Sequence, residues 1–166
     1  MERMFTPWRM AYIAGPHERS CILCTKPGED NDRANLIVYR GQRCYVLLNL
    51  YPYNNGHLMI APYAHIGDLE ELPPETAAEL MHLTQKSIRA LRLSMSPHGF
   101  NIGMNLGRVA GAGIADHVHL HVVPRWQGDT NFMPLICGTK LIPELLEETY
   151  EKLHRAFRKL EGETEA

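Results

Sequence analysis

Three histidines at alternate positions are the first feature of this sequence that could do chemistry. His117, His119 and His121 stand in the stretch ADHVHLHVVPRW, residues 115–126. In a β-strand successive side chains point to opposite faces and neighbours on one face lie about 6.6 Å apart, so the three imidazoles would share a face. Burial of three imidazoles without partners is unfavourable. The spacing therefore predicts an active surface or a metal site, and the alternative is an exposed polar face that happens to use histidine.

A glycine-rich loop comes directly before these histidines. The segment NLGRVAGAGIAD contains Gly107, Gly111 and Gly113. Glycine lets a ligand approach the backbone closely, and backbone N–H groups in such loops can face a phosphate, although many loops of this kind are only tight turns. A neutral imidazole can attack phosphorus, and a second imidazole can donate a proton to the leaving oxygen. Together the loop and the histidines predict chemistry on a phosphate group.

A Cys-x-x-Cys pair is the second candidate site. Cys21 and Cys24 form the motif CILC. Taken alone, the pair is compatible with half of a zinc site, with a redox pair or with chance, because a closed tetrahedral zinc site needs two more ligands. Cys44 and Cys137 lie in apolar stretches, where we expect unreactive core residues.

Size and composition favour one soluble domain. The chain has 166 residues, 45% of them hydrophobic and 22% charged, and a formal net charge of −2. This balance gives no general field for nucleic acid or membranes. No apolar run approaches the roughly 18 residues of a membrane span, and the first ten residues lack the apolar middle of a secretory signal. We therefore expect a cytoplasmic protein whose cysteines do not form a disulfide framework.

The elements that must position these residues follow from the hydrophobic pattern. Two segments have apolar residues at three- and four-residue spacing, which predicts amphipathic helices over 73–94 and 143–160. Gly41 predicts a two-residue hairpin turn between the first two strands. Strands are expected over 35–40, 43–51, 56–62, 99–107 and 117–124. The apolar stripes are Ala77, Leu80, Met81, Thr84, Ile88 and Leu91 on the first helix and Ile142, Leu145, Leu146, Tyr150, Leu153 and Phe157 on the second.

This order of elements predicts an α+β fold in a single domain. Strands grouped around one mid-chain helix and one C-terminal helix suggest a mainly antiparallel sheet. We expect residues 1–34 to be irregular and to carry the cysteine pair. Residues 35–126 would form the core, and residues 127–166 would add an extension and a helix to the same domain.

Two motifs, in fixed order, resemble the histidine-triad family of nucleotide hydrolases and transferases. HVHLHVV matches the family signature of three alternating histidines, and NLYPYNNGHLMIAP is similar to the family's strand that opens with Gly-His. The resemblance covers roughly residues 20–126. It implies a small five-stranded antiparallel sheet with two helices, a nucleotide substrate with adenine as the expected base, and a homodimer.

The resemblance also implies roles for single residues. His119 would be the nucleophile that forms a nucleotidyl-imidazole intermediate, His121 would contact the phosphate or the leaving group, and His57 would be a fourth histidine beside the phosphate. Asn49 would bind the ribose hydroxyls, or else cap a turn. Further nucleotide contacts are expected from Asn105, from the backbone at Gly111 and Gly113, and from a base pocket of Leu47, Val46 and Met59, which are otherwise plain core residues.

Zinc-containing relatives use an early Cys-x-x-Cys, a histidine eight residues beyond the Gly-His histidine, and the first triad histidine. Here these places hold Cys21, Cys24, His65 and His117. The resemblance therefore implies a structural zinc site that ties the N-terminal segment to the sheet. On the histidine strand, one imidazole would hold metal while the next does chemistry.

The branch of the family is indicated by departures from its other patterns. Ile114 stands where the nucleoside-phosphoramidate branch has a serine, and the loop before the histidines lacks the glutamine of the fragile-histidine-triad branch. The extension after Trp126 and the early stretch TPWRMAYI resemble bacterial diadenosine-tetraphosphate phosphorylase-like members, in which phosphate resolves the intermediate to give ADP and ATP. The alternatives are a diadenosine tri- or tetraphosphate hydrolase and a nucleoside phosphoramidase.

Two readings from other classes stay open. One is a nucleotide-binding sensor without turnover, although binding alone does not need a nucleophile. The other is a zinc hydrolase with all three triad histidines as ligands. Such a site needs a partner that activates water, usually a carboxylate, and Asp116 would lie on the opposite face of the strand.

Overall fold

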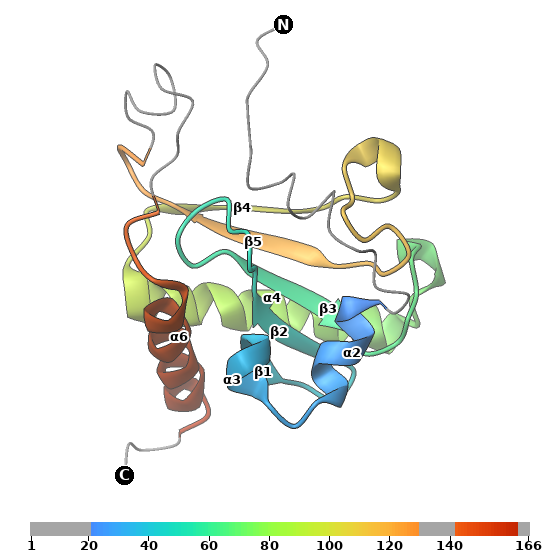
Figure 1. Cartoon of the computed structure of the whole chain (residues 1–166), viewed down its shortest axis with the longest axis horizontal. Coiled ribbons are helices and arrows are strands. Elements are labelled where there is room, and N and C mark those ends of the chain that lie inside the picture. Colours follow the sequence, from blue (N-terminus) through green and yellow to red (C-terminus); the bar gives the residue numbers. More distant parts are fainter. Residues whose placement is uncertain (1–20, 130–141, 163–166) are drawn as a thin grey trace, which may run out of the picture.

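A five-stranded antiparallel sheet forms the centre of the molecule (Figure 1). The computed structural model describes residues 21–129 and 142–162. The spatial order of the strands is β1-β2-β3-β5-β4, and every neighbouring pair is antiparallel. This confirms the predicted α+β fold. The strands are β1 (Ile37–Arg40), β2 (Cys44–Leu48), β3 (Leu58–Pro62), β4 (Gly99–Met104) and β5 (Leu120–Arg125).

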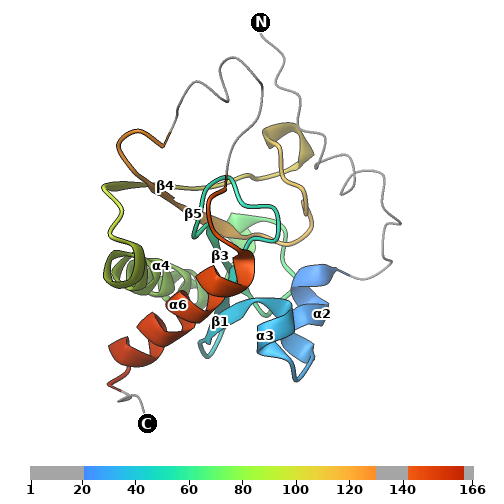
Figure 2. The same ribbon diagram turned by 60° about the vertical axis from the view of Figure 1, so that its left-hand side comes forward.

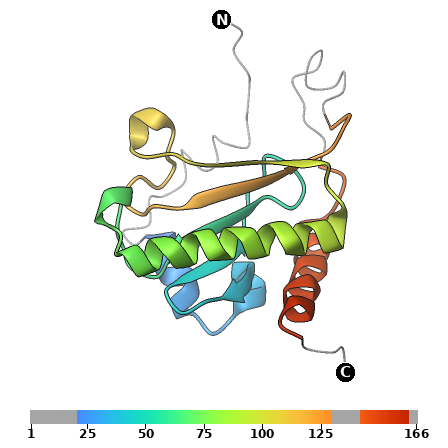
Figure 3. The same ribbon diagram turned by 180° about the vertical axis from the view of Figure 1, so that it is seen from behind.

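The two predicted helices cover one face of this sheet. α4 (Pro74–Met95) runs across the back of the strands, and α6 (Leu146–Leu160) packs against α4 and β1 (Figure 3). Alternate strand residues point toward them, as period-two burial requires. Within the described part of the chain, no helix has the length and apolarity to cross a membrane. The core on this face includes Val46, Leu48, Leu58, Ile60, Leu120 and Val122 from the sheet and Leu80, Leu83, Leu91, Leu153 and Phe157 from the helices.

The other face of the sheet is partly covered by two short helices that the sequence analysis did not predict. α2 (Ile22–Gly28) and α3 (Asp32–Asn35) lie beside β1 and the sheet (Figure 2). The expectation of an irregular segment up to residue 34 is therefore wrong for residues 22–28 and 32–34. These helices are too short for an apolar period, and Pro27 lies within the first. A second core forms beneath them from Leu23, Ile37, Tyr45, Leu47 and Ala61.

Several local expectations differ from the structure. Three residues, 41–43, separate β1 from β2, so the hairpin loop is one residue longer than expected, and the Gly41 N–H donates to the Cys44 carbonyl at 2.8 Å. Met81 is 51% exposed, because the buried stripe of α4 runs instead through Leu83 and Ala90. Leu145 precedes α6 and is 66% exposed.

The histidine segment begins before its strand does. β5 starts at Leu120, so His117 and His119 lie in the extended chain that leads into it. The alternation of side chains nevertheless continues through this chain, because Val118 is buried in the same core as Leu120. Two single 3-10 turns complete the described elements, η1 (Leu69–Glu71) and η2 (Arg108–Ala110). The stretch TPWRMAYI, Cys137 and most of the extension after Trp126 lie outside the described residues.

Candidate active site and metal centre

Three of the predicted histidines come together on the face of the sheet opposite α4. His57 directly precedes β3, His121 lies in β5, and His119 stands just before β5. The His57 and His121 rings have centroids 5.1 Å apart, and those of His119 and His121 are 4.9 Å apart. His57 is completely buried and His119 is 5% exposed. The alternative of an exposed polar face is therefore wrong, because His117 and His119 are buried, His121 is partly buried, and each of these imidazoles has a partner.

The partners of His57 and His121 fix the position of their ring protons. The backbone N–H of Tyr53 donates to Nδ1 of His57 at 3.1 Å, so the proton of His57 sits on Nε2. That Nε2 lies 2.9 Å from Nδ1 of His121, which must then accept. The proton of His121 is consequently on Nε2. His121 thus has one N–H left to donate to a ligand.

His119 has the opposite arrangement. Its Nδ1 lies 2.8 Å from the backbone carbonyl oxygen of His117. A carbonyl oxygen can only accept, so Nδ1 of His119 carries the proton. Nε2 therefore keeps its lone pair. A lone pair beside an N–H donor from His121 is an arrangement that can attack an electrophilic centre and stabilise the group that leaves it.

Burial keeps these imidazoles neutral. It lowers the pKa of His57 to about 3, helped by repulsion from His121 and His119. It likewise lowers the pKa of His121 to about 4, with His119 as the second cause. Burial also lowers the pKa of His119, and the hydrogen bond to the His117 carbonyl acts against that shift. At neutral pH the lone pair on His119 is therefore available in the protein without ligand.

The loop between β2 and β3 sets the orientation of His57. Gly56 has a φ of +72°, and a Cβ there would lie 2.7 Å from the Met95 sulfur. Asn54 accepts the His57 N–H at 3.2 Å through its carbonyl, and its side chain donates to the Pro124 carbonyl at 3.0 Å. The Tyr53 ring lies over His57, with centroids 4.8 Å apart. The sequence analysis assigned no role to Tyr53 or Asn54, although both lie within the stretch NLYPYNNGHLMIAP.

Other candidate nucleotide contacts lie around this loop and on the strands beside it. The Asn49 oxygen accepts the Tyr51 N–H at 2.9 Å, which is the turn-capping role, and its side-chain nitrogen lies 3.4 Å from Nδ1 of His57. Leu47 pairs with Met59 across β2 and β3, and Met59 pairs with His121. Leu47 is buried and Met59 is only partly buried, so Met59 is better placed for a ligand. Val46 points to the opposite face, into the core with α4, so it does not belong to this pocket.

The glycine-rich loop offers fewer free amides than expected. The Gly111 N–H donates to the Arg108 carbonyl at 3.0 Å within the turn of η2, so this amide is already used. Gly113 is exposed and follows that turn. Asn105 is partly buried and comes directly after β4. Ile114 packs beside the second core that contains Leu47.

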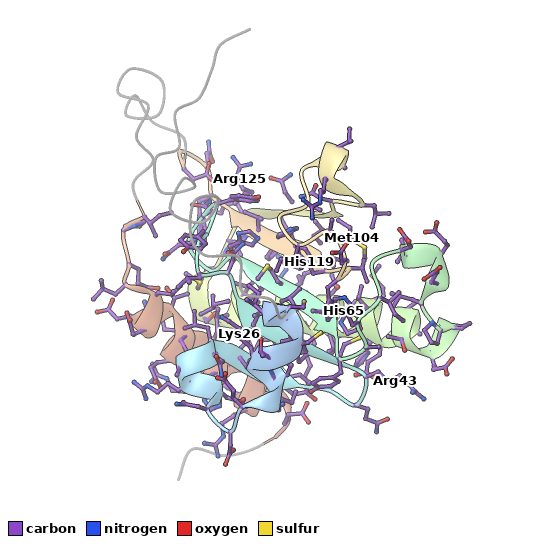
Figure 4. The ribbon with its side chains drawn as sticks, turned by 45° about the vertical axis from the view of Figure 1, so that its right-hand side comes forward. Lys26, Arg43, His65, Met104, His119 and Arg125 are labelled. Atoms are coloured by element: carbon purple, nitrogen blue, oxygen red, sulfur yellow. The ribbon has the colours of Figure 1, made fainter. Side chains whose placement is uncertain are left out.

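The four predicted metal ligands come together at the end of β3. The ligand atoms of Cys21, Cys24, His65 and His117 all lie within 4.8 Å of one another. Nδ1 of His117 is 3.4 Å from each of the two sulfurs, and Nδ1 of His65 is 3.3 Å from the sulfur of Cys24. Figure 4 shows His65 and His119 on the same side of the sheet.

This cluster fits a tetrahedral metal ion. With metal–sulfur and metal–nitrogen bonds of about 2.3 and 2.0 Å, sulfur and nitrogen ligands should lie roughly 3.5 Å apart, close to the distances found. Nε2 of His117 donates to the Pro62 carbonyl at 2.8 Å, which leaves Nδ1 as the atom free to ligate. Two thiols and two imidazoles could therefore hold a metal here.

A separate shallow cavity of about 340 Å³ lies between β1 and α6. It contains none of the predicted site residues. Its charged groups already pair within the protein, as Arg40 does with Asp32 at 2.7 Å. The cavity gives no reason to place the chemistry away from the histidines.

Comparison with known proteins establishes the family. The HIT domain profile matches residues 31–128. This chain belongs to the HIT domain family. Among its HIT relatives, AP-4-A phosphorylase of Mycobacterium tuberculosis is 46% identical over 157 residues, which are 90% of this chain and 80% of the relative.

Solved structures agree with this assignment. The crystal structure of a Zn-bound histidine triad family protein from Mycobacterium smegmatis superposes with a TM-score of 0.70 at 30% identity, and the match covers 87% of this chain and 98% of that one. A uridylyltransferase has a TM-score of 0.66 at 17% identity and covers 92% of this chain, with half of its own length matched (49%). At that identity the uridylyltransferase shares only the fold.

Proposed function

We propose that this HIT protein is an enzyme that cleaves dinucleoside polyphosphates by nucleotidyl transfer, with diadenosine tetraphosphate as substrate and inorganic phosphate as acceptor. The observation that carries the proposal is the pair of opposite tautomers, a lone pair on Nε2 of His119 beside an N–H on Nε2 of His121. The similarity to AP-4-A phosphorylase supports the substrate class.

The reaction would take two steps. Nε2 of His119 attacks the α-phosphorus and forms a P–N bond, while the anhydride P–O bond breaks and its electron pair leaves with ATP. Phosphate then attacks the same phosphorus, the P–N bond breaks, its electron pair returns to Nε2, and ADP is released. His121 donates a hydrogen bond to the leaving oxygen, and His57 holds His121 in the tautomer that can do so.

The neutral state of the histidine pair favours a phosphoanhydride over a phosphoramidate. An amine must be protonated to leave, whereas a polyphosphate leaves as a stable anion and needs only hydrogen bonding. Burial lowers the pKa of His121 to about 4, so at neutral pH it offers a hydrogen bond rather than a ready proton. Ile114 stands where the nucleoside-phosphoramidate branch has a serine, and this difference also favours a phosphoanhydride substrate.

The nucleotide would lie along β2 and β3. We place the adenine near Met59, with the buried Leu47 beneath it, and the ribose near the side chain of Asn49. Gly113 and Asn105 would face the phosphate chain. Because the Gly111 amide is used within its own turn, we assign Gly111 only the role of shaping the loop.

We propose zinc as the metal held by Cys21, Cys24, His65 and His117. A closed four-ligand site of this kind stabilises structure and supplies no reactive group. The Zn-bound relative from Mycobacterium smegmatis supports this assignment. Metal analysis of protein purified without chelator should give close to one equivalent of zinc, and less than about a tenth of an equivalent would contradict it.

We also propose a homodimer in the cytoplasm. β4 is an edge strand with Ile102 46% exposed, and exposed edges of this kind are candidates for pairing with another chain. Light scattering should report twice the chain mass, and Ile102→Lys should lower it. The cysteines at 21, 24 and 44 are free thiols, as a reducing compartment allows.

Product analysis is the decisive test. Protein incubated with diadenosine tetraphosphate should yield ADP and ATP only when phosphate is present. Formation of AMP and ATP both with and without phosphate would show hydrolysis instead. Nucleotide binding without any cleavage would favour a sensor. His119→Ala should abolish the products, and His82→Ala, on the exposed surface of α4, is the matched control.

A further inference from the structure

The segment that carries the proposed nucleophile is not held by the sheet. The pairing of β3 with β5 begins at Leu120, opposite Ile60, and the pairing of β4 with β5 also ends there. Residues 117–119 lie beyond this ladder. Since the position of the lone pair on His119 decides whether it can attack phosphorus, something other than strand pairing must hold this segment in place.

The segment is attached to the chain that follows β3. The Val118 N–H donates to the Ile66 carbonyl at 2.7 Å, and Nε2 of His117 donates to the Pro62 carbonyl at 2.8 Å. The backbone at Gly67 approaches residue 115 so closely that a Cβ there would lie 3.1 Å from its carbonyl oxygen. The anchoring chain also carries His65, one of the four clustered ligands.

His117 serves two sites with two different groups. Its side-chain Nδ1 faces the sulfurs of Cys21 and Cys24, each at 3.4 Å. Its backbone carbonyl accepts the Nδ1 proton of His119 at 2.8 Å. His117 is completely buried, so neither group can move without disturbing the other. One residue therefore connects the metal centre with the histidine proposed to attack the substrate.

We propose that the metal centre positions the nucleophile. The bound ion fixes His117, and the His117 carbonyl then holds His119 in the tautomer with its proton on Nδ1 and its lone pair on Nε2. His117 is thus a positioning residue. This inference rests on the proposed zinc site and on the proposed role of His119, and it adds that the two sites are coupled through a single backbone carbonyl.

The second histidine pair provides an internal control. The tautomer of His57 is fixed by the Tyr53 N–H, and that of His121 is fixed by His57. None of these contacts involves a residue of the metal cluster. If the coupling is specific, loss of metal changes the state of His119 and leaves the His57–His121 hydrogen bond as it was.

The test compares the full chain with zinc bound and after removal of zinc by a chelator. Nitrogen NMR of the imidazole rings reports which ring nitrogen of each histidine carries the proton. With zinc, His119 should be a single Nδ1–H tautomer. Without zinc, it should become a mixture while His57 stays protonated on Nε2. The kcat should fall about 10- to 100-fold and KM should stay the same, as expected when an orienting contact made outside the substrate is lost.

Two variants at His65 separate the ion from the side chain. His65 is exposed, and its ring lies against Cys24 and His117 rather than against His119, so His65→Ala should remove the metal with little direct effect on His119. His65→Cys keeps a zinc ligand and should restore both the single tautomer and kcat. Equal loss in both variants would overturn the proposal.

Three other outcomes of the zinc-removal experiment would each overturn the coupling. If zinc removal leaves the His119 tautomer and kcat unchanged, the coupling is wrong although the zinc site and the enzyme activity stand. If the tautomers of His57 and His119 are lost together, the metal merely holds the fold and the specific coupling is overturned. If the protein retains no zinc when loaded, the zinc site and the coupling both fail, whereas the product assay still decides the activity.

Discussion

Acidification should destabilise this protein through the hydrogen-bonded pair of His57, which is buried, and His121, which is partly buried. In the unfolded chain both imidazoles have an ordinary pKa of 6.5, whereas burial lowers the pKa of His57 to about 3 and that of His121 to about 4 in the fold. Because the folded-state pKa values are depressed, the fold favours the neutral rings. This contribution is fully present above pH 6.5 and is lost as the pH falls toward the folded values.

The magnitude follows from the pH interval. For each imidazole, the free energy of unfolding of the protein falls by roughly 1.4 kcal/mol per pH unit below 6.5. At pH 5 that amounts to about 2 kcal/mol for each ring and about 4 kcal/mol for the pair. His57→Gln should halve this loss, because a Gln side chain can still donate to Nδ1 of His121 but does not ionise. His57 is not among the causes that depress the pKa of His121, so the second ring should keep its share.

Urea unfolding of the wild type and of His57→Gln, both zinc-saturated, at pH values from 5 to 8 measures this difference. All other titrating groups, including the clustered cysteines and histidines of the proposed metal centre, are shared, so they cancel between the two proteins. The free energies of unfolding should diverge as the pH rises, with the wild type gaining about 2 kcal/mol more between pH 5 and pH 8. Parallel curves would refute the assignment of a buried neutral His57.

Three further predictions concern single residues. Gly56→Ala should lower the free energy of unfolding by about 1–3 kcal/mol, because φ is +72° and the new Cβ would lie 2.7 Å from the Met95 sulfur; unchanged urea unfolding would contradict this. Cys44 should resist thiol reagents in the native protein, because burial raises its pKa to about 12. Peptide mapping of metal-free protein measures the labelling rates, and labelling of Cys44 as fast as that of Cys24 would contradict this prediction. Asp129→Ala should destabilise by about 1–3 kcal/mol, because the carboxylate accepts from Arg125 at 2.7 Å and Asn54 at 2.9 Å; thermal melts should show Asp129→Asn to be milder.

The elements of regular secondary structure with a clear hydrophobic period were predictable from the sequence. Strand alternation around His121 and the long apolar period of α4 both come from local spacing, and the structure confirms the sheet and the helix. The four clustered ligands were named only through a family resemblance. The spacing of Cys21 and Cys24 alone did not decide between zinc, redox and chance, and 93 residues of sequence separate Cys24 from His117.

The remaining features depend on backbone groups that sequence patterns do not contain. The tautomer of His119 is set by a carbonyl, and that of His57 by the N–H of Tyr53. The Gly111 amide was expected to face phosphate, but the turn of η2 uses it. α2 was not predicted, because a helix of seven residues that contains Pro27 has no recognisable apolar period. The roles of the individual nucleotide contacts remain predictions.

The order of the strands has a consequence for synthesis of this protein. β1, β2 and β3 can pair as soon as each has emerged from the ribosome, but β5 lies between β3 and β4 although it is made last. Until residues 117–125 are available, the two halves of the sheet have no common strand. A nascent chain halted at β4 would carry Cys21, Cys24, His65 and His57, yet it would have neither the complete proposed metal centre nor the proposed nucleophile. Activity and metal retention should therefore arise together, at the end of translation of the sheet, rather than by stages.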